Sequence, residues 1–348
     1  MAYTNIDDPS AYFQTAIYTG NGGSDRAIVN DGNSAMQPDW VWYKSRSNAT
    51  SNILYDSSRG ADYYLKSNTT GAEGSDAQMF ESFDSDGFSL NGDTDGNGNG
   101  RTYVAWQWKA NGGTNQGSNY QVNTTSGFSI GTYTGNRASV VTANHGLGAK
   151  LDFLLIKSRS AAGSWVAWHK SDPTKVMFLD ATDAAFGYGT YFDAAPNANT
   201  SSFSVGDAGA TNAAGVTYLF YGFAEKQGYS KFGKYVGNGN ADGSFVYTGF
   251  KPAFVMLKDV TQATNWEMFD HKRNPSNVAN LKLGANLSVA ENGSDLGNTS
   301  QNNIDMLSNG FKMRTGNTDT NVSGDTYIYM AFAENPFTTS TGVPTTAR

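Results

Sequence analysis

The sequence predicts an all-β protein composed of three tandem β-sandwich domains. A set of short landmarks occurs three times in the same order, and aromatic and β-branched runs alternate with clusters of Gly, Asn, Asp and Ser. No long window has the apolar spacing of an amphipathic helix. Charged residues make up 16% of the chain, which is too few for long solvated helices. β-structure is therefore the default expectation.

A Tyr-Thr/Val-Gly-Asn motif marks the start of each copy. It begins at Tyr18, Tyr133 and Tyr235, at intervals of roughly a hundred residues. Four further landmarks follow at similar offsets, and the last of them is an aromatic strand-like run at residues 103–108, 218–223 and 327–332. Because five landmarks recur in a fixed order, the repeat cannot be the chance recurrence of one motif.

The landmarks divide the chain into complete domains. The first copy contains eight candidate strands, near residues 14–19, 27–30, 40–44, 53–56, 63–67, 82–84, 88–90 and 103–108. This is the content of a two-sheet sandwich and is too large for one propeller blade or solenoid repeat. We expect an N-terminal segment at 1–12, sandwiches at 13–112, 120–227 and 228–337, and a C-terminal tail at 338–348. If each sandwich is autonomous, deletion of residues 233–348 leaves a soluble folded protein.

Two of the predicted strands are apolar without interruption, at residues 153–156 and 254–257. A strand with one exposed face would alternate, so these strands are expected to be covered on both faces, by neighbouring copies or by another subunit. The join at 111–118 is rich in Gly and Asn and is expected to be a flexible linker. The join at 226–232 is short, which predicts contact between the second and third domains.

The composition excludes several function classes. The chain has 24 Lys and Arg against 31 Asp and Glu, and its net charge of −7 disfavours a nucleic-acid-binding surface. Without cysteine it has no disulfide, thiolate metal site or cysteine nucleophile. It has no eighteen-residue apolar run, and its first ten residues lack the layout of a signal peptide. We therefore expect no nucleic-acid partner, no membrane association and no Sec-type leader.

Residues able to perform acid–base chemistry are few and scattered. The three histidines, His145, His169 and His271, occupy different positions in their copies, so no shared catalytic centre is expected. Three pairs of acids are close in sequence, Asp84 with Asp86, Asp180 with Asp183, and Glu267 with Asp270. Glycoside hydrolysis needs two acids across a cleft, but any all-β chain contains such pairs by chance. We predict no catalytic residues, no enzymatic activity and no cofactor.

One segment matches half of a calcium-binding loop. Asp93, Asp95 and Asn97, followed by Gly98, agree with the first half of the motif. The twelfth position should be a bidentate carboxylate, and here it is Val104. Asp93, Asp95 and Asn97 are therefore only weak metal candidates, and an ordinary Gly/Asn-rich hairpin loop is the preferred interpretation.

The tryptophans allow two interpretations. Aromatic faces beside Asn and Asp form sugar-binding platforms in many lectins, whereas alternation within a strand places a tryptophan in the core. Core packing is favoured for each of the seven: Trp40, Trp42, Trp106, Trp108, Trp165, Trp168 and Trp266. The sequence identifies no ligand-binding residue.

The first copy resembles a repeat module found in virion proteins of marine bacteriophages, including phages of cyanobacteria. The resemblance is carried by residues 18–22, 38–47, 54–60, 83–88 and 103–110. The other copies diverge: both lack the Ser-Arg-Gly element of residues 58–60, and the third has Lys258-Asp259 in place of Lys-Ser-Arg.

This resemblance implies a non-enzymatic structural protein of the particle with a jelly-roll or lectin-like sandwich fold. It implies a tail fibre or adhesin, or a decoration of the particle surface, made in the host cytoplasm without a signal peptide. The implied partners are other virion proteins, host surface glycan in the case of an adhesin, and further copies of the chain, with a trimer favoured for a fibre. The alternative from a different class is a carbohydrate-active tail depolymerase.

Overall fold

The computed structural model describes residues 2–114, 119–137, 140–296, 303–316 and 319–345, and nearly all of its regular structure is antiparallel β-sheet. The helical segments among these residues are short: α1 (Thr94–Asn97), α2 (Gly209–Asn212), η1 (Pro9–Ala11) and η2 (Ser294–Leu296). None of the described helices has the length and hydropathy needed to cross a membrane. The predicted all-β, multi-sandwich class is confirmed.

The first copy, called repeat 1 (residues 13–112), forms a larger sheet of order β1-β9-β3-β4-β5-β6 and a smaller one of order β2-β8-β7. The strands are β1 (Phe13–Thr19), β2 (Arg26–Val29), β3 (Trp40–Ser45), β4 (Ile53–Asp56), β5 (Tyr63–Lys66), β6 (Gly74–Ser75), β7 (Phe80–Asp84), β8 (Gly87–Leu90) and β9 (Thr102–Trp108). Val41, Tyr55 and Phe88 belong to a core between these two sheets.

Repeat 2 (residues 120–227) has the same plan. Its larger sheet has the order β10-β11-β18-β13-β14-β15-β16, and its smaller sheet pairs β12 with β17. The strands are β10 (Tyr120–Asn123), β11 (Phe128–Thr134), β12 (Val141–Asn144), β13 (Phe153–Ser158), β14 (Val166–His169), β15 (Lys175–Phe178), β16 (Phe186–Gly187), β17 (Ser202–Val205) and β18 (Thr217–Phe223).

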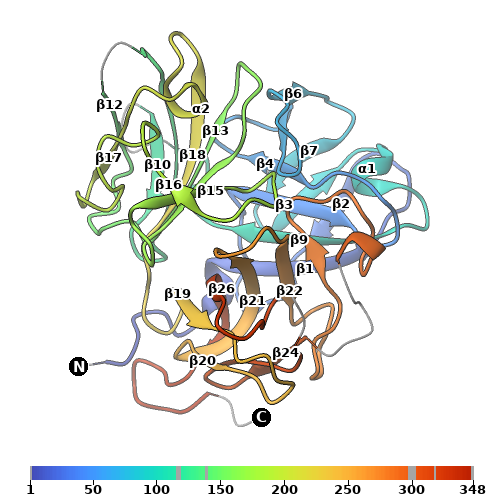
Figure 1. Cartoon of the computed structure of the whole chain (residues 1–348). Helices are drawn as coiled ribbons and strands as arrows, with labels where there is room; N and C mark the ends of the chain where they lie inside the picture. The colour runs from blue at the N-terminus through green and yellow to red at the C-terminus, as the bar shows by residue number, and fades with distance from the viewer. Residues whose placement is uncertain (1, 115–118, 138–139, 297–302, 317–318, 346–348) are drawn as a thin grey trace.

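Repeat 3 (residues 228–337) repeats the plan again. Its sheets have the orders β19-β26-β21-β22-β23 and β20-β25-β24. The strands are β19 (Ser230–Val236), β20 (Phe245–Tyr247), β21 (Phe250–Asp259), β22 (Trp266–Asp270), β23 (Leu283–Gly284), β24 (Ile304–Leu307), β25 (Gly310–Met313) and β26 (Thr326–Pro336). Figure 1 shows the three repeats as three lobes around a common centre.

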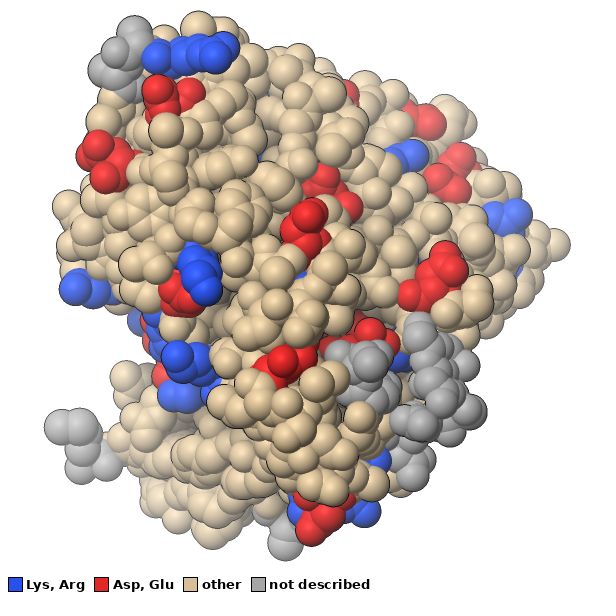
Figure 2. Space-filling view, viewed as in Figure 1, with Lys and Arg blue, Asp and Glu red and all other residues tan. Residues whose placement is uncertain are grey.

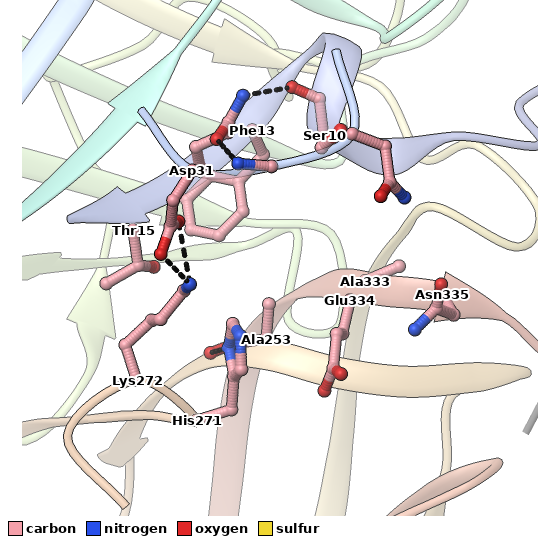
Figure 3. A pocket seen from close by; sticks show the side chains of 13 residues that line it. Ser10, Phe13, Thr15, Asp31, Ala253, His271, Lys272, Ala333, Glu334 and Asn335 are labelled. Carbon is pink, nitrogen blue, oxygen red and sulfur yellow. Dashed lines mark hydrogen bonds and ion pairs between the residues drawn. The ribbon is translucent and has the colours of Figure 1, made fainter. Parts of the chain in front are cut away.

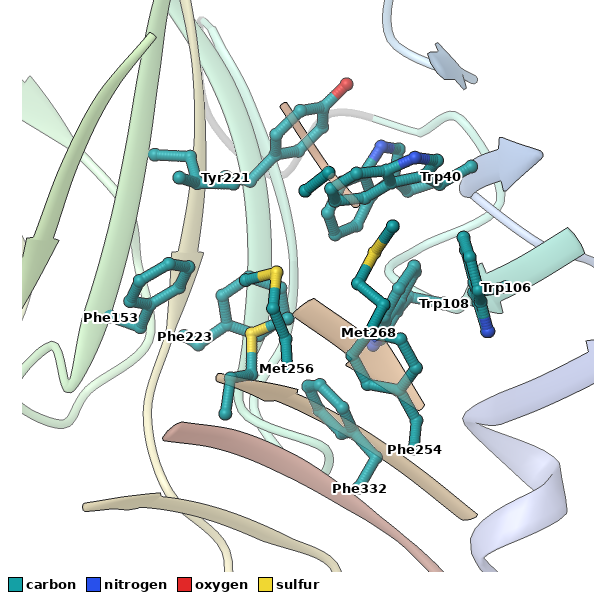
Figure 4. Close-up of a cluster of buried hydrophobic side chains, with 14 of the residues drawn as sticks. Trp40, Trp106, Trp108, Phe153, Tyr221, Phe223, Phe254, Met256, Met268 and Phe332 are labelled. Atoms are coloured by element: carbon teal, nitrogen blue, oxygen red, sulfur yellow. The ribbon is translucent and has the colours of Figure 1, made fainter. Parts of the chain in front are cut away.

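The outer faces of the three larger sheets meet in a central core (Figure 4). Trp40 of repeat 1 stacks on Tyr221 of repeat 2, with ring centroids 4.2 Å apart. Phe332 of repeat 3 lies 5.6 Å from Trp108 and 5.7 Å from Phe223, so rings of all three repeats are in contact. As a result β3, β13 and β21 are buried along their whole length, which confirms the prediction that such strands are covered on both faces.

The segments outside the sandwiches contact the three repeats. In the N-terminal segment, Ile6 enters the central core and the Thr4 hydroxyl donates to the carbonyl of Gln227 at 2.7 Å. At the first join, the amides of Gly112 and Gly113 donate to Asp39 at 3.0 and 2.9 Å. Residues 115–118 of this join and residues 346–348 of the tail lie outside the described residues.

Because the three repeats share a central core, deletion of residues 233–348 is no longer expected to leave a soluble folded protein. We now expect the truncated chain to aggregate, because removal of Phe254 and Phe332 uncovers the aromatic faces of Trp108 and Phe223. Calorimetry of the full chain should show one cooperative unfolding transition. Size-exclusion chromatography that recovers a monodisperse, folded truncated protein would contradict this shared-core account.

Candidate functional site

The Tyr-Thr/Val-Gly-Asn motif lies at the ends of β1, β11 and β19, each of which pairs with the last strand of its repeat, and connects that strand to the loop before the last strand. Its tyrosines stack on the first tyrosine of the last strand at 5.1, 5.1 and 5.0 Å: Tyr18 on Tyr103, Tyr133 on Tyr218 and Tyr235 on Tyr327. Gly20 must be glycine because a Cβ there would lie 2.3 Å from the carbonyl oxygen of Gly98. The motif therefore has a structural role.

The half calcium motif belongs to the same loop. The buried Asn97 amide donates to Asn21 Oδ1 at 3.0 Å and to the carbonyl of Gly23 at 2.7 Å. Asp93 accepts the amide N–H of Asp95 at 2.7 Å and so caps α1. Among the described residues, no three His, Asp or Glu side chains are grouped as metal ligands. Loop structure therefore accounts for the residues that the sequence offered for calcium.

Three equivalent seams join the repeats in a ring. In each seam a main-chain amide of one repeat donates to a carbonyl of the next: Glu73 to Arg159 (2.8 Å), Ala185 to Val260 (3.0 Å) and Glu291 to Arg46 (2.8 Å). These contacts define a 1–2 seam, a 2–3 seam and a 3–1 seam. Since repeat 3 closes back on repeat 1, each lobe contacts both of the others.

A buried lysine also crosses each seam. Each ammonium donates to a carbonyl of the neighbouring repeat: Lys157 to Thr70 (3.3 Å), Lys258 to Thr182 (3.1 Å) and Lys44 to Ser288 (3.2 Å). Burial lowers the pKa of all three lysines to about 8. The three lysines occupy equivalent positions in β3, β13 and β21.

A chain of buried charges crosses the 1–2 seam. Arg59 and Asp56 are fully buried and are joined by a 2.5 Å ion pair. Asp56 also accepts the hydroxyl proton of Tyr221, from repeat 2, at 2.8 Å. Arg59 contacts Glu73 at 3.2 Å, and Glu73 in turn makes a two-pronged contact with Arg159 of repeat 2, with both distances 2.9 Å. Charge-assisted bonds of this kind fix the relative position of the two repeats.

The 3–1 seam has the same network. Arg273 is bonded to Asp270 at 2.5 Å and to Glu291 at 3.0 Å, and Glu291 reaches Arg46 of repeat 1 at 2.9 Å. The indole N–H of Trp106 takes the place of the Tyr221 hydroxyl, 3.1 Å from Asp270. Repeat 3 thus keeps the arginine of the Ser-Arg-Gly element, which the sequence comparison missed because only the neighbouring Ser and Gly are lost.

The 2–3 seam is largely apolar instead. His169 replaces the buried aspartate, lies 3.2 Å from the carbonyl of Tyr329 and packs beside Phe232. Burial lowers the pKa of His169 to about 3, so the ring is neutral at pH 7. Ala185 and Val260 stand where the other seams have Glu and Arg.

The other candidates from the sequence are separated in the structure. His145 is buried, and desolvation lowers its pKa to about 4, whereas His271 lies by the carbonyl of Ala253 at 3.2 Å. Glu267 and Asp270 point to opposite faces of β22, toward Lys282 and Arg273 respectively.

The remaining acids and the tryptophans also have structural contacts. Asp84 accepts the hydroxyl protons of Ser82 and Ser89, and Asp180 accepts the amide of Trp165. All seven tryptophans are at most 1% exposed, so the preferred core assignment is confirmed and none of them is a surface platform.

A cavity of about 280 Å³ lies at the 3–1 seam (Figure 3). Lys272 spans its edge to Asp31, with 2.7 Å to each carboxylate oxygen. Ala253 in its wall corresponds to Asp39 of repeat 1 and Asp152 of repeat 2. Asp39 accepts the amides of Gly112 and Gly113, and Asp152 accepts the amide of Glu225, so each aspartate binds the chain where it leaves its repeat. The cavity lies at the corresponding place in repeat 3.

The comparisons with known proteins give one match. Residues 8–336 match the family described as a domain of unknown function, DUF7483. No curated protein and no solved structure matches the chain. Because the match covers all three repeats and ends at the last residue of β26, it corresponds to the whole ring.

Loss of Arg59 should be strongly destabilising. Arg59→Ala leaves the Asp56 carboxylate buried without its counter-charge, and we expect this to lower the free energy of unfolding by about 3–5 kcal/mol. The matched control is Lys175→Ala, which removes the more exposed ion pair with Asp172 and should cost about 0–1 kcal/mol. Urea unfolding followed by tryptophan fluorescence measures both, and equal effects would refute the assigned role of Arg59.

The seam lysines should make stability depend on pH. Their pKa is about 8 in the folded protein against 10.5 for a free lysine, so between these values the unfolded chain binds more protons. The free energy of unfolding should therefore rise from pH 8 to pH 10, whereas below pH 8 the lysines add no slope. Lys157→Met should reduce the rise, and the exposed control Lys234→Met should not. An unchanged slope in Lys157→Met would be inconsistent with this assignment.

Proposed function

The chain belongs to the DUF7483 family, and we propose that it is a non-enzymatic structural protein of a bacteriophage particle. The observation that carries this proposal is the closed ring of three sandwiches around one aromatic core. Such a ring is a rigid block with three similar outer lobes, which suits a building unit better than an enzyme that opens and closes on a substrate. The resemblance of repeat 1 to phage virion modules supplies the biological setting.

The placement of the polar groups supports a structural role. The charges at the 1–2 and 3–1 seams are paired with one another, either within one repeat or across the seam. Two of the three histidines are buried with pKa values of about 3 and 4, which leaves them unable to take a proton at pH 7. Among the described residues, the acid pairs suggested by the sequence do not face one another across the cavity at the 3–1 seam.

The surface supports binding to other proteins rather than to a polyanion. Figure 2 shows a face that is mostly uncharged, with basic and acidic side chains interspersed. Large apolar side chains are exposed on repeat 3: Val236 is 54%, Phe245 47% and Tyr247 54% exposed. We call these three residues the apolar patch. Exposed aromatic and aliphatic groups of this kind are typical of protein–protein contacts.

We propose that the apolar patch docks on another virion protein at the particle surface. A fibre or adhesin would in addition bind host surface glycan and assemble as a homo-oligomer, with a trimer favoured. Light scattering of the purified chain measures the oligomeric state. Electron cryomicroscopy of intact particles tests the main proposal, because density for the three-lobed ring on the capsid or the tail is the expected result.

The depolymerase alternative predicts a different outcome. Incubation with host surface polysaccharide should release no new reducing ends if the chain is structural. Sustained turnover that is lost on replacement of one Asp or Glu would overturn the proposal.

The apolar patch can be tested by substitution. Phe245→Ser and Tyr247→Ser together should reduce incorporation into particles at least tenfold, while the melting temperature of the isolated protein stays unchanged because both side chains are exposed. Val29→Ser is the matched control, since Val29 occupies the position of Tyr247 in repeat 1 and is 66% exposed. Quantitative mass spectrometry of purified particles gives the copy number. Equal incorporation of all variants would eliminate the patch as the docking site.

A further inference from the structure

Three ionisable side chains meet inside repeat 3. Lys282, just before β23, places its Nζ 2.7 Å from Oε1 of Glu267 on β22. The same Nζ lies 3.7 Å from Oδ2 of Asp319, in the loop before β26. Lys282 and Glu267 are fully buried, and the side chain of Asp319 is 14% exposed. An amine is thus held close to two carboxyl groups away from water.

The fold itself does not require this cluster. Trp266 and Met268 point into the central core, so Glu267 points the other way, between the two sheets of repeat 3. The register of the sheets places apolar or aromatic residues at the same two positions elsewhere: Ile53 and Tyr64 in repeat 1, and Val166 and Val176 in repeat 2. Since repeats 1 and 2 form the sandwich with uncharged residues at these two positions, formation of the sandwich does not explain the charged pair in repeat 3.

The pair is also costly as a simple ion pair. Removing both charges from water carries a penalty that their mutual attraction recovers only when every remaining polar atom is bonded. Oε2 of Glu267 is buried and has no hydrogen-bond partner among the described residues. Burial raises the pKa of Glu267 to about 7, against the charge of Lys282 and with a further increase from Asp319. Glu267 can therefore both take and release a proton near pH 7.

We propose that Lys282 and Asp319 form an intramolecular isopeptide bond, with Glu267 as the proton relay. The amine lies 3.7 Å from a carboxyl oxygen of Asp319, close to the separation of about 3–3.5 Å at which positioned groups react. The third group, Glu267, touches the amine directly and is coupled electrostatically to Asp319. The inference does not depend on the proposed particle function.

The reaction is a condensation that releases one water. The neutral amine of Lys282 attacks Cγ of the protonated Asp319 carboxyl group, so that a C–N bond forms and the Cγ–OH bond breaks. The Glu267 carboxylate takes a proton from the attacking nitrogen and transfers it to the departing hydroxyl. Glu267 is regenerated, and no oxidant or other co-reactant is required.

The initial proton distribution is available within the cluster. The proton that Lys282 carries as an ammonium ion is the one that Asp319 needs as a carboxylic acid. Glu267 lies beside Lys282 and can carry that proton, so the cluster takes up none from solvent.

The bond would link Lys282, which immediately precedes β23, to Asp319 in the loop before the long strand β26. A cross-link limits the conformations of the unfolded chain and so stabilises the folded state. In a chain without cysteine, such a bond would have the role that disulfides have in many extracellular proteins.

Intact-protein mass spectrometry of the purified full chain tests the proposal. The expected mass, after allowance for loss of Met1, is lower than the sequence mass by one water, about 18 Da. Trypsin should fail to cut after Lys282 and should yield a branched peptide that joins residues 274–312 to residues 315–348. A wild-type protein of full sequence mass would overturn the proposal.

Variants separate this bond from other losses of water, such as cyclisation at an Asp-Gly pair. Glu267→Gln and Asp319→Ala should each restore the full mass in the soluble protein and lower the melting temperature. Glu334→Gln is the matched control, because Glu334 pairs with Lys251 in the same repeat, and it should keep the water loss. A water loss that persists in Asp319→Ala would also overturn the proposal. The mass of the wild-type protein tests the proposal even if a variant does not fold.

Discussion

The structure depends on the need to bury both faces of each larger sheet. One face packs on the smaller sheet of the same repeat, and the other carries aromatic side chains such as Trp40, Phe223 and Phe254. A single repeat would expose that second face to water. Burial of each large aromatic side chain stabilises the folded protein by about 2–3 kcal/mol, and a single repeat would lose this contribution. Three repeats in a ring cover one another, so the three-fold arrangement follows from this one constraint.

The seams show how polar groups are used within that arrangement. In the 1–2 and 3–1 seams, a buried Asp-Arg pair and a bridging glutamate connect two repeats. The 2–3 seam has His169, Ala185 and Val260 at the corresponding positions and still forms the same main-chain hydrogen bond. The charges are therefore not needed to close a seam. Their effect is on register, because a displaced repeat would break the ion pairs of Glu73 with Arg159 and of Glu291 with Arg46.

Strand content and repeat number could be read from the sequence because both are local. Alternating apolar residues and Gly/Asn turns fix where a strand begins, and the landmarks recur in order. The central core could not be read in this way, since contacts such as Trp40 with Tyr221 join residues far apart in the chain. The opposite directions of Glu267 and Asp270 were available from strand periodicity, because side chains three apart lie on different faces. Lys282 was also visible in the sequence as a charged residue between Leu281 and Leu283.

The departures from the shared plan gather in repeat 3. It alone carries the buried cluster of Lys282, Glu267 and Asp319, and it has Ala253 where the other repeats have an aspartate that holds a join. It also carries the exposed aromatic residues Phe245 and Tyr247. Repeats 1 and 2 form the same sheets without the charged cluster, whereas exposed apolar side chains such as Val29 and Tyr63 also occur on repeat 1. The origin of resistance to unfolding is therefore to be sought first in repeat 3, where the charged cluster lies, while repeats 1 and 2 supply the frame that holds it.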